Sequence, residues 1–243
     1  MHRRQLLASA ASLMSAFILP ADAMTIYGAA PAPTATTMPP VPVIPGAWMF
    51  FTAGEASAVD AIAARLIPAD RLGPGAHEAG CAVFIDRQLA GPYGDGTTLY
   101  LRPPFASGTP EQGPQTASTP AQHYRAGLAA LDRFCVAAFV GRGFAALAPV
   151  QQDAVLTRLE GGLLGLGGIS EPSFFALLLK NTREGFLSDP IYGGNRGMVG
   201  WALIGFPGAR YDYRAEIAHP GQALTLPPVG LLGRDAWHTG TPA

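Results

Sequence analysis

Apolar residues recur at the three- and four-residue intervals of a helix face in several stretches of the chain. The first stretch begins at Thr52 and Glu55, whose spacing is that of a capping box, and it ends before Pro68. Its apolar positions are Val59, Ile62, Ala63 and Leu66. The pattern therefore predicts a helix across this stretch, with one face turned toward a core.

The clearest helical pattern begins at Thr119, a capping residue that is followed by Pro120 at the first helical position and Gln122 at the third. The apolar positions that follow it are Tyr124, Leu128, Leu131 and Cys135. Further helices are predicted from about His77 to Leu89, from Pro149 to Glu160, and from Ser170 toward Thr182. Strand-type alternation is scarce. The predicted fold class is therefore mostly α, a small helical core with long ordered loops rich in glycine and proline.

The stretch from Arg183 to Tyr211 has a different character. Seven glycines and two prolines interrupt it, which favours a series of tight turns over one regular element. It also contains many large apolar residues, Trp201 among them. Such a stretch is not an ordinary solvated loop, so we expect it to pack on the chain's own helices or on another protein.

Segments without a regular pattern surround the predicted helices, which lie within residues 47–218. Residues 24–46 are rich in proline, alanine and threonine and carry no charge, which predicts an extended linker or arm. Residues 91–117 are interpreted as a long irregular excursion. Residues 219–243 are again rich in proline and glycine and are interpreted as an extended tail that could cross a partner.

The first 23 residues predict an export signal rather than a part of the fold. Arg3 and Arg4 precede a short apolar run, and Ala21-Asp22-Ala23 has the form of a cleavage site. The arginine pair favours the twin-arginine route, and therefore the periplasm; the alternative is an ordinary secretory signal with a basic start. The apolar run is short for a membrane anchor, and the best later candidate, after Phe134, is interrupted by Arg142.

Composition and motifs mainly exclude functions. With a net charge of −1 and only 14% charged residues, we expect no attraction to nucleic acid or to anionic lipid. The sequence has no Cys-x-x-Cys-His motif for haem, no Gly-x-Gly-x-x-Gly after a strand, no His-x-x-x-His pair and no Gly-x-Ser-x-Gly elbow. We therefore predict no catalytic residue, no cofactor and no metal site in this chain.

The two cysteines, Cys81 and Cys135, both lie on apolar faces of predicted helices. In an exported protein two cysteines predict one disulfide, which would stabilise the fold by about 4 kcal/mol on the loop-entropy model. The alternative is two free buried thiols that act as small apolar side chains.

Two segments of the chain together resemble the signatures of one family. The first is Phe186-Leu187-Ser188-Asp189-Pro190-Ile191-Tyr192-Gly193-Gly194-Asn195, followed by Gly205-Phe206-Pro207-Gly208. The second is Ile67-Pro68-Ala69-Asp70, followed by Gly73-Pro74-Gly75-Ala76-His77-Glu78-Ala79-Gly80. Over roughly residues 50–215 the chain is similar to the gluconate 2-dehydrogenase subunit 3 family, the small subunits of membrane-associated flavin sugar and sugar-acid dehydrogenases.

The resemblance implies a non-catalytic small subunit that supports the export, assembly and stability of a catalytic subunit. FAD and haem c are then expected in partner chains, an FAD-dependent dehydrogenase subunit and a multihaem cytochrome c subunit, through which the complex meets the membrane. An alternative is a stand-alone exported sugar-binding protein, or a small enzyme, that uses the loop from Gly193 to Gly197.

The candidate interface residues lie in the C-terminal signature and just after it: Asp189, Tyr192, Asn195, Arg196, Trp201 and Phe206. The charged side chains could pair across an interface, or they could cap helices and hold loops in place. The aromatic side chains could anchor a partner, because large aromatics concentrate binding energy, or they could belong to the core.

Overall fold

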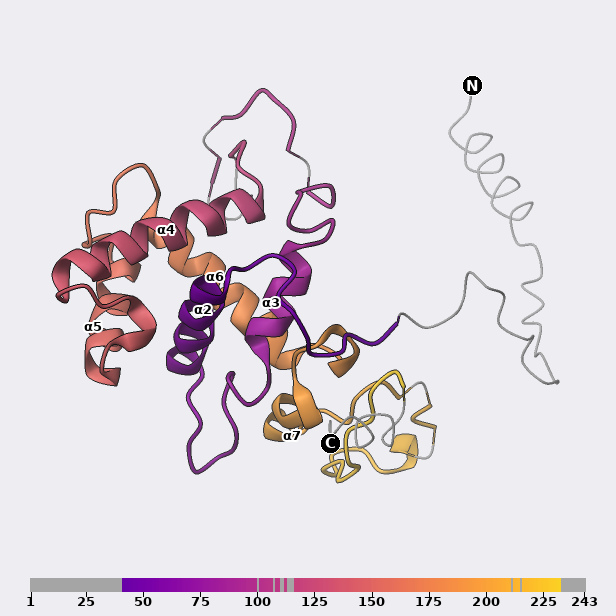
Figure 1. Ribbon diagram of the computed structural model, residues 1–243. Coiled ribbons are helices and arrows are strands. Elements are labelled where there is room, and N and C mark those ends of the chain that lie inside the picture. Colours follow the sequence, from indigo (N-terminus) through magenta and orange to yellow (C-terminus); the bar gives the residue numbers. More distant parts are fainter. Residues whose placement is uncertain are drawn as a thin grey trace, which may run out of the picture. The chain divides into compact units, whose positions relative to one another are not determined.

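The computed structural model describes residues 41–99, 101–106, 108–109, 112, 116–210, 212–214 and 216–232 (Figure 1). All of these residues belong to one compact unit. The predicted signal segment 1–23, most of the predicted arm and residues 233–243 of the predicted tail lie outside the described residues.

The described part of the chain is mostly α-helical, which confirms the predicted fold class. Its α-helices are α2 (Ala53–Leu66), α3 (Cys81–Leu89), α4 (Pro120–Ala138), α5 (Pro149–Glu160), α6 (Glu171–Leu187) and α7 (Val199–Ile204). Short 3-10 helices cover Phe144–Ala146, Pro190–Tyr192, Arg196–Met198 and Glu216–Ala218. No β-strand occurs among the described residues, and none of the helices described is both long and apolar enough to cross a bilayer.

Two helices begin where their capping residues predict. The Thr52 Oγ1 atom accepts the Glu55 N–H at 3.3 Å, and the Thr119 Oγ1 atom accepts the Gln122 N–H at 3.3 Å. In both cases the side chain of the third helical residue returns to the backbone of the capping residue, which completes the capping box. The structure also confirms the predicted bounds of α5.

Two predicted helix boundaries were wrong. Helix α3 begins at Cys81 rather than near His77, because Gly80 adopts a left-handed conformation with φ 74° that does not continue a helix backward. Helix α6 continues past Thr182 to Leu187 and so takes in the start of the stretch expected to form only turns.

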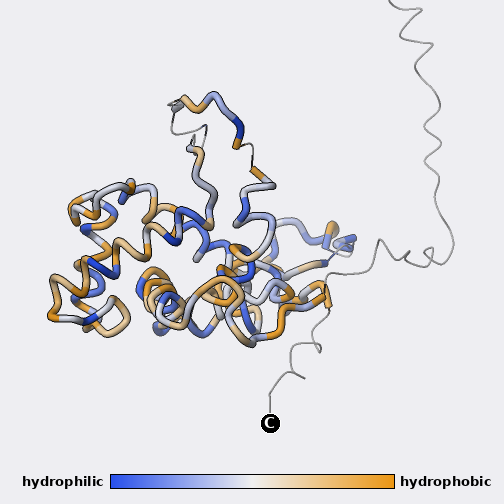
Figure 2. The backbone as a smooth tube through the Cα atoms, turned by 45° about the horizontal axis from the view of Figure 1, so that its top comes forward, coloured by the Kyte–Doolittle hydropathy of each residue, from blue (hydrophilic) through white to orange (hydrophobic). Residues whose placement is uncertain are grey.

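Helix α6 is the central element of the fold, because it packs against each of the other α-helices that the structure describes. Its Phe174 ring lies edge-on to the Tyr124 ring of α4, with 6.1 Å between the ring centroids. The two helices approach so closely that a Cβ atom on Gly127 would lie 2.4 Å from the Phe174 ring. Hydrophobic and hydrophilic positions alternate along the helical part of the tube in Figure 2, as the periodic sequence pattern predicts.

A buried carboxylate fixes the chain segment that leads into α2. Asp86 of α3 is fully buried and accepts the backbone N–H groups of Met49, Phe50 and Phe51 at 2.9, 3.0 and 2.9 Å. The neighbouring Arg87 guanidinium also contacts this carboxylate. Asp86 is therefore an internal anchor of the fold.

A second carboxylate closes the glycine-rich loop between α5 and α6. Glu171 accepts the N–H groups of Leu164 and Leu166 at 2.8 and 2.7 Å. Burial disfavours the charge on Glu171, but the backbone donors, first Leu166 and then Leu164 and Gly165, outweigh burial and hold the pKa of the carboxyl below its ordinary value.

The predicted disulfide is not formed in the structure. Cys81 and Cys135 are both free and buried. Cys81 lies in a small cluster with Ala63, Ala76 and Phe186, whereas Cys135 lies in the main core. Helical periodicity placed both thiols on apolar faces, but it could not show that these faces belong to different clusters. Burial raises the pKa of Cys81 to about 12 and that of Cys135 to about 11, so both thiols stay protonated.

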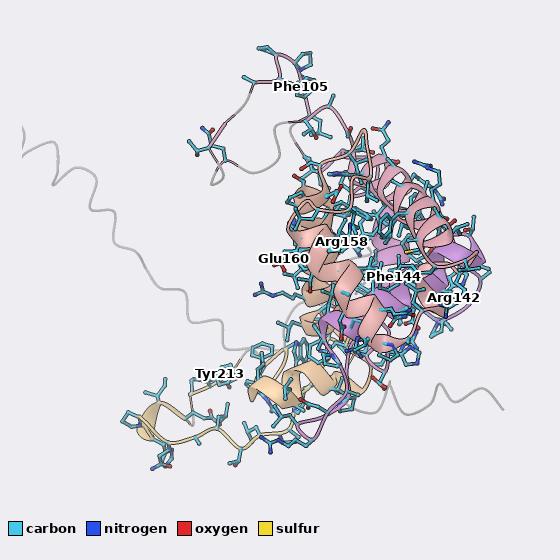
Figure 3. The ribbon with its side chains drawn as sticks, turned by 90° about the vertical axis from the view of Figure 1, so that its left-hand side faces the viewer. Phe105, Arg142, Phe144, Arg158, Glu160 and Tyr213 are labelled. Atoms are coloured by element: carbon cyan, nitrogen blue, oxygen red, sulfur yellow. The ribbon has the colours of Figure 1, made fainter. Side chains whose placement is uncertain are left out.

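The loop that joins α3 to α4 projects from the helices in Figure 1, and Figure 3 shows Phe105 on this loop, away from the helices. The start of the loop is held to the body, since the Ala121 N–H donates to the Gly94 carbonyl at 3.1 Å. The described part of the loop forms turns but no α-helix, as the sequence predicts.

Candidate functional site

The segment that follows α6 is more regular than the sequence indicated. After Leu187 the chain forms two short 3-10 helices and then α7, instead of turns alone. Left-handed residues separate these elements: Gly193 has φ 92°, and Gly205, with φ 69°, ends α7. Glycine adopts these angles without the steric cost that a side chain would impose.

Asn195 holds this segment together from the inside. Its side chain is fully buried, its Nδ2 atom donates to the Ser188 carbonyl at 2.8 Å, and its Oδ1 atom accepts the Gly200 N–H at 2.8 Å. One side chain therefore connects the end of α6 to the start of α7.

Trp201 is part of the core rather than of the surface. It is 5% exposed, and its Nε1–H donates to the Leu187 carbonyl at 2.7 Å. That carbonyl lies in the last turn of α6, where helix carbonyls lack an intrahelical partner. The Trp201 ring also meets the Phe206 ring edge-on, with 5.2 Å between centroids.

Two glycines let this segment lie directly on the backbone of α6. A Cβ atom on Gly200 would lie 2.0 Å from the Phe186 carbonyl oxygen, and one on Gly194 would lie 2.2 Å from the Gly185 carbonyl oxygen. No side chain fits at either position. The C-terminal signature is thus a close-packed layer on the end of α6.

Asp189 is the point at which the two described ends of the chain converge. Its Oδ1 atom accepts the Ile191 N–H at 2.9 Å, and its Oδ2 atom accepts the Leu231 N–H at 2.8 Å. The Ile191 carbonyl in turn accepts the Val43 N–H at 2.8 Å. The arm before α2 and the tail after Phe206 therefore dock on one turn.

The described part of the tail returns to the body. Gly208 and Val229 form an isolated parallel bridge, in which the Ala209 N–H donates to the Val229 carbonyl at 2.6 Å. The Arg210 guanidinium adds a bond to the Pro227 carbonyl at 2.8 Å.

Arg196 joins the two segments that carry the family resemblance. Its backbone N–H donates to the Ala79 carbonyl at 3.1 Å, and its side chain covers Gly80, where a Cβ atom would lie 2.4 Å from the Arg196 Nε atom. Burial lowers the pKa of the Arg196 guanidinium, while the nearby Asp60 and Cys81 act in the opposite direction.

Of the six candidate interface residues, the structure exposes Tyr192 and Phe206. Asp189, Asn195, Arg196 and Trp201 are engaged in the internal contacts described above. Further exposed apolar side chains accompany the exposed pair. Together they form a set that we call the signature surface: Leu187, Tyr192, Leu203, Ile204, Phe206 and Leu231.

Sequence reasoning missed Leu187, Leu203, Ile204 and Leu231 as parts of this surface. Leu203 follows Trp201 by two residues in α7, so the angular steps of a helix turn it away from the buried side of Trp201, and Ile204 is the last residue of this helix. That signal was hidden because the glycines of the stretch favoured turns over a helix.

A groove of about 960 Å³ runs beside this surface. Its walls come from the end of α3, the start of the loop to α4, and α6 with the turn after it. The lining includes Leu99, Leu179, Arg183, Glu184, Leu187 and Tyr192. The lining also includes Tyr93 and Asn181, whose hydroxyl and amide groups are hydrogen-bonded to each other at 3.1–3.2 Å.

A family model described as gluconate 2-dehydrogenase subunit 3 matches residues 53–208, well over half of the chain. The chain belongs to this family. The match begins at the first residue of α2 and ends at Gly208, where the tail bridges back to the body. It therefore covers both signature segments and the layer that they form on α6. No curated protein and no solved structure matches the chain.

Membership of the subunit 3 family makes this chain a small subunit of an oxidoreductase complex. Among the described residues, no group of three or more histidine, cysteine, aspartate and glutamate side chains could hold a metal ion. The one buried side-chain polar atom without a partner there is the Tyr124 hydroxyl, which lies in the main core.

Proposed function

We propose that the chain is the non-catalytic small subunit of a periplasmic, membrane-associated flavin dehydrogenase that oxidises gluconate, 2-ketogluconate or a related sugar or sugar acid. In this role it supports the export, assembly and stability of the catalytic subunit. FAD is bound by that catalytic subunit, and haem c by a multihaem cytochrome c subunit that receives the electrons and links the complex to the membrane.

The observation that carries this proposal is the signature surface. Its apolar side chains are exposed, although the residues beneath them are fixed by buried hydrogen bonds and by close backbone packing. A rigid layer that presents several apolar side chains to water is typical of a protein interface. Tyr192 and Phe206 are the aromatic anchors of this surface.

The contacts of the signature segment do not favour a stand-alone sugar-binding protein. A sugar site in the loop from Gly193 to Gly197 would need polar groups that are free to bind hydroxyls. The Asn195 amide, the polar side chain at the centre of that loop, already bonds Ser188 and Gly200. Neither cysteine supplies a nucleophile, because burial keeps both thiols protonated.

Affinity purification of the chain from gently solubilised membranes tests the proposal. A flavin-containing dehydrogenase and a haem protein should co-purify, and both should be visible in the absorbance spectrum, whereas the isolated chain should carry neither. A chain that purifies alone and binds sugar by itself would contradict the proposal.

A surface variant tests the place of the interface. Ile204→Asp puts a charge on a side chain that is 60% exposed, so the fold should be kept while the yield of co-purified catalytic subunit falls at least about tenfold, since an unpaired charge in an interface costs several kcal/mol. The matched control is Ile217→Asp, another exposed isoleucine, which lies outside the family match. Equal losses in the two variants, or none in either, would exclude the signature surface as the interface.

Export is tested separately by replacing Arg3 and Arg4 with lysine. The twin-arginine route moves folded cargo, which suits a flavoprotein that acquires its cofactor inside the cell. The double variant should therefore leave both this chain and the catalytic subunit in the cytoplasm, with dehydrogenase activity intact there but not coupled to respiration. A catalytic subunit that still reaches the periplasm would leave only the structural role.

A further inference from the structure

The corner between α4 and α5 is a second exposed apolar region that the proposed function does not use. Val136 lies in the last turn of α4, Val140 lies two residues after the end of this helix, and Val150 lies in the first turn of α5. Their exposed fractions are 42%, 94% and 78%. The corner contains the stretch after Phe134 that is the best candidate for a membrane span after the signal segment and that is interrupted by Arg142.

Val140 is held in a conformation that does not suit its side chain. Its φ of 53° lies in the left-handed region, which β-branched residues rarely adopt. Glycine would take this angle without strain, and water surrounds the valine side chain almost completely. A strained backbone that presents an apolar side chain to solvent points to a contact that is absent from the isolated chain.

The charged residues between Arg133 and Gln152 are all of one sign. From Arg133 to Gln152 the sequence contains no aspartate or glutamate, and Arg133 and Arg142 are its charged residues. Arg133 precedes Val136 by three positions on the same face of α4. The Arg142 Nε–H donates to the Phe139 carbonyl at 3.2 Å, which keeps its guanidinium next to Val140.

The carboxylates on either side do not cancel this charge equally. Asp153 is paired with Arg65, with 2.7 Å between the Nη2 and Oδ2 atoms. Asp132 directly precedes Arg133 and is exposed, so it offsets part of the charge. The two arginines and Asp132 leave the corner with one net positive charge, although the net charge of the whole chain, −1, had predicted no attraction to anionic lipid.

The corner lies at the left-hand end of the helices in Figure 1, whereas α7 lies at the lower right. Figure 2 shows hydrophobic and hydrophilic positions side by side at this left-hand end. In Figure 3 the buried Phe144 lies among the helices, and Arg142 lies at their outer edge. A molecule bound at the corner would therefore leave the signature surface free for a protein partner.

We propose that this corner binds the headgroup layer of an anionic phospholipid bilayer, with the valines entering the apolar boundary and the two arginines contacting phosphates. The net positive charge of the corner matches an anionic lipid surface, to which each arginine near the bilayer is attracted. The contact is weak in isolation, because few apolar side chains enter the bilayer. It gains strength when a partner holds the chain close to the membrane, since a tethered contact acts at a high effective concentration. This contact would be made by the chain itself, in addition to any link through partner subunits.

Flotation of the purified full chain with lipid vesicles tests the proposal. The chain should float with vesicles of phosphatidylglycerol and phosphatidylcholine more than with vesicles of phosphatidylcholine alone. Val140→Gly should reduce binding to the mixed vesicles by about tenfold, the value of burying one valine side chain. The fold should not suffer, because glycine relieves the strain at this position. The matched control, Leu72→Asn, changes another exposed apolar side chain in a different turn and should not alter binding.

Arg142→Gln should weaken binding to the mixed vesicles by about fivefold and leave binding to phosphatidylcholine unchanged. Binding that Val140→Gly leaves unchanged would assign it to another part of the chain, such as the apolar run of the signal segment, and would overturn the proposal. A Val140→Gly variant that loses a protein partner while the parent chain ignores both kinds of vesicle would overturn it in favour of a protein contact.

Discussion

The two ends of α6 are stabilised in different ways. Around its first half, apolar side chains from α2, α4 and α5 pack into one core. At its last turn, a layer of short elements is fixed by a few hydrogen bonds that the side chains of Asn195, Asp189 and Trp201 make, and by glycines that touch the helix backbone. The first region depends on many interchangeable contacts, and the second on a few specific ones.

This difference matters for the role of each region. A core of apolar contacts tolerates substitutions that keep its volume. A layer held by directional bonds keeps one shape, because each bond fixes a position and not only a separation. A rigid layer is what a binding surface needs, since less freedom is lost when a partner docks.

The largest loss of stability is expected from Asp86, a buried polar residue in a region that is otherwise held by apolar contacts. Asp86→Ala would leave the backbone donors of Met49, Phe50 and Phe51 without their acceptor and would remove the carboxylate that pairs with the Arg87 guanidinium. The free energy of unfolding should fall by about 3–5 kcal/mol, as measured by chemical denaturation. Asp70→Ala, the control, removes an exposed turn contact to Leu72 and should cost about 1 kcal/mol or less. A similar small loss in both variants would show that apolar packing alone holds the first region.

Trp201→Ala tests the second region in the same measurement. The variant loses a buried aromatic side chain and the bond to the Leu187 carbonyl, so a cost of about 3–5 kcal/mol is expected. Tyr213→Ala is a suitable control, because that ring is exposed and should cost about 1 kcal/mol or less. If Trp201→Ala kept its stability and lost only its partner, the residue would be an interface anchor and not a core residue.

Gly200→Ala sharpens the comparison by adding a single methyl group. Because that carbon would lie 2.0 Å from the Phe186 carbonyl oxygen, α7 must move, and a cost of about 1–3 kcal/mol is expected. Gly54→Ala in α2 is the matched change, since no atom lies within 4 Å of the added carbon. It should leave stability unchanged or raise it by about 0.4–1 kcal/mol. The thermal unfolding midpoint should fall for Gly200→Ala and should stay the same or rise for Gly54→Ala.

A smaller loss of stability is expected when the pH is lowered and Glu171 becomes protonated. Its pKa is lower in the folded chain than the ordinary value of 4.5. The stability that its charge contributes is therefore fully present above 4.5 and is lost as the pH falls through the lower folded pKa. Unfolding free energies of the parent chain and of Glu171→Gln should differ near neutral pH and converge in acid. A difference that stays constant with pH would rule out the carboxylate as the group responsible.

The smallest effect is expected from reductant, because the structure contains no disulfide. Cys81 and Cys135 should both be alkylated in the denatured, unreduced protein, and neither should react in the folded protein. Mass spectrometry measures the alkylation of both cysteines in the folded and in the denatured protein. A peptide pair joined through these residues in the exported protein would restore the disulfide that the sequence predicted.

The sequence predicted the first region better than the second for a physical reason. Capping residues such as Thr52 and Thr119 act on donors three residues away, so their effect can be recognised from neighbouring positions in the sequence. The start of α3 was misplaced because Gly80 is positioned under Arg196, which comes from the other end of the chain. Contacts of that kind leave no periodic trace in the sequence.

The candidate site shows the same limit. The sequence located the right stretch and the right aromatic residues, but it could not separate the buried Trp201 from the exposed Tyr192 and Phe206. That distinction depends on α7, whose six residues are too few to show a helical period. The resemblance to a family marked the stretch as important without showing which side chains face outward.

The meeting of both arms on Asp189 and Ile191 has a mechanical consequence. A force that separates residues 43 and 231 would act first on the Val43–Ile191 and Leu231–Asp189 hydrogen bonds. Each arm has one such bond at the turn, so the two bonds would break one after the other rather than share the force. The arms would peel away at low force while the helices stayed folded. A single-molecule pulling trace should therefore show a small early release of length, well separated from the rupture of the helical core.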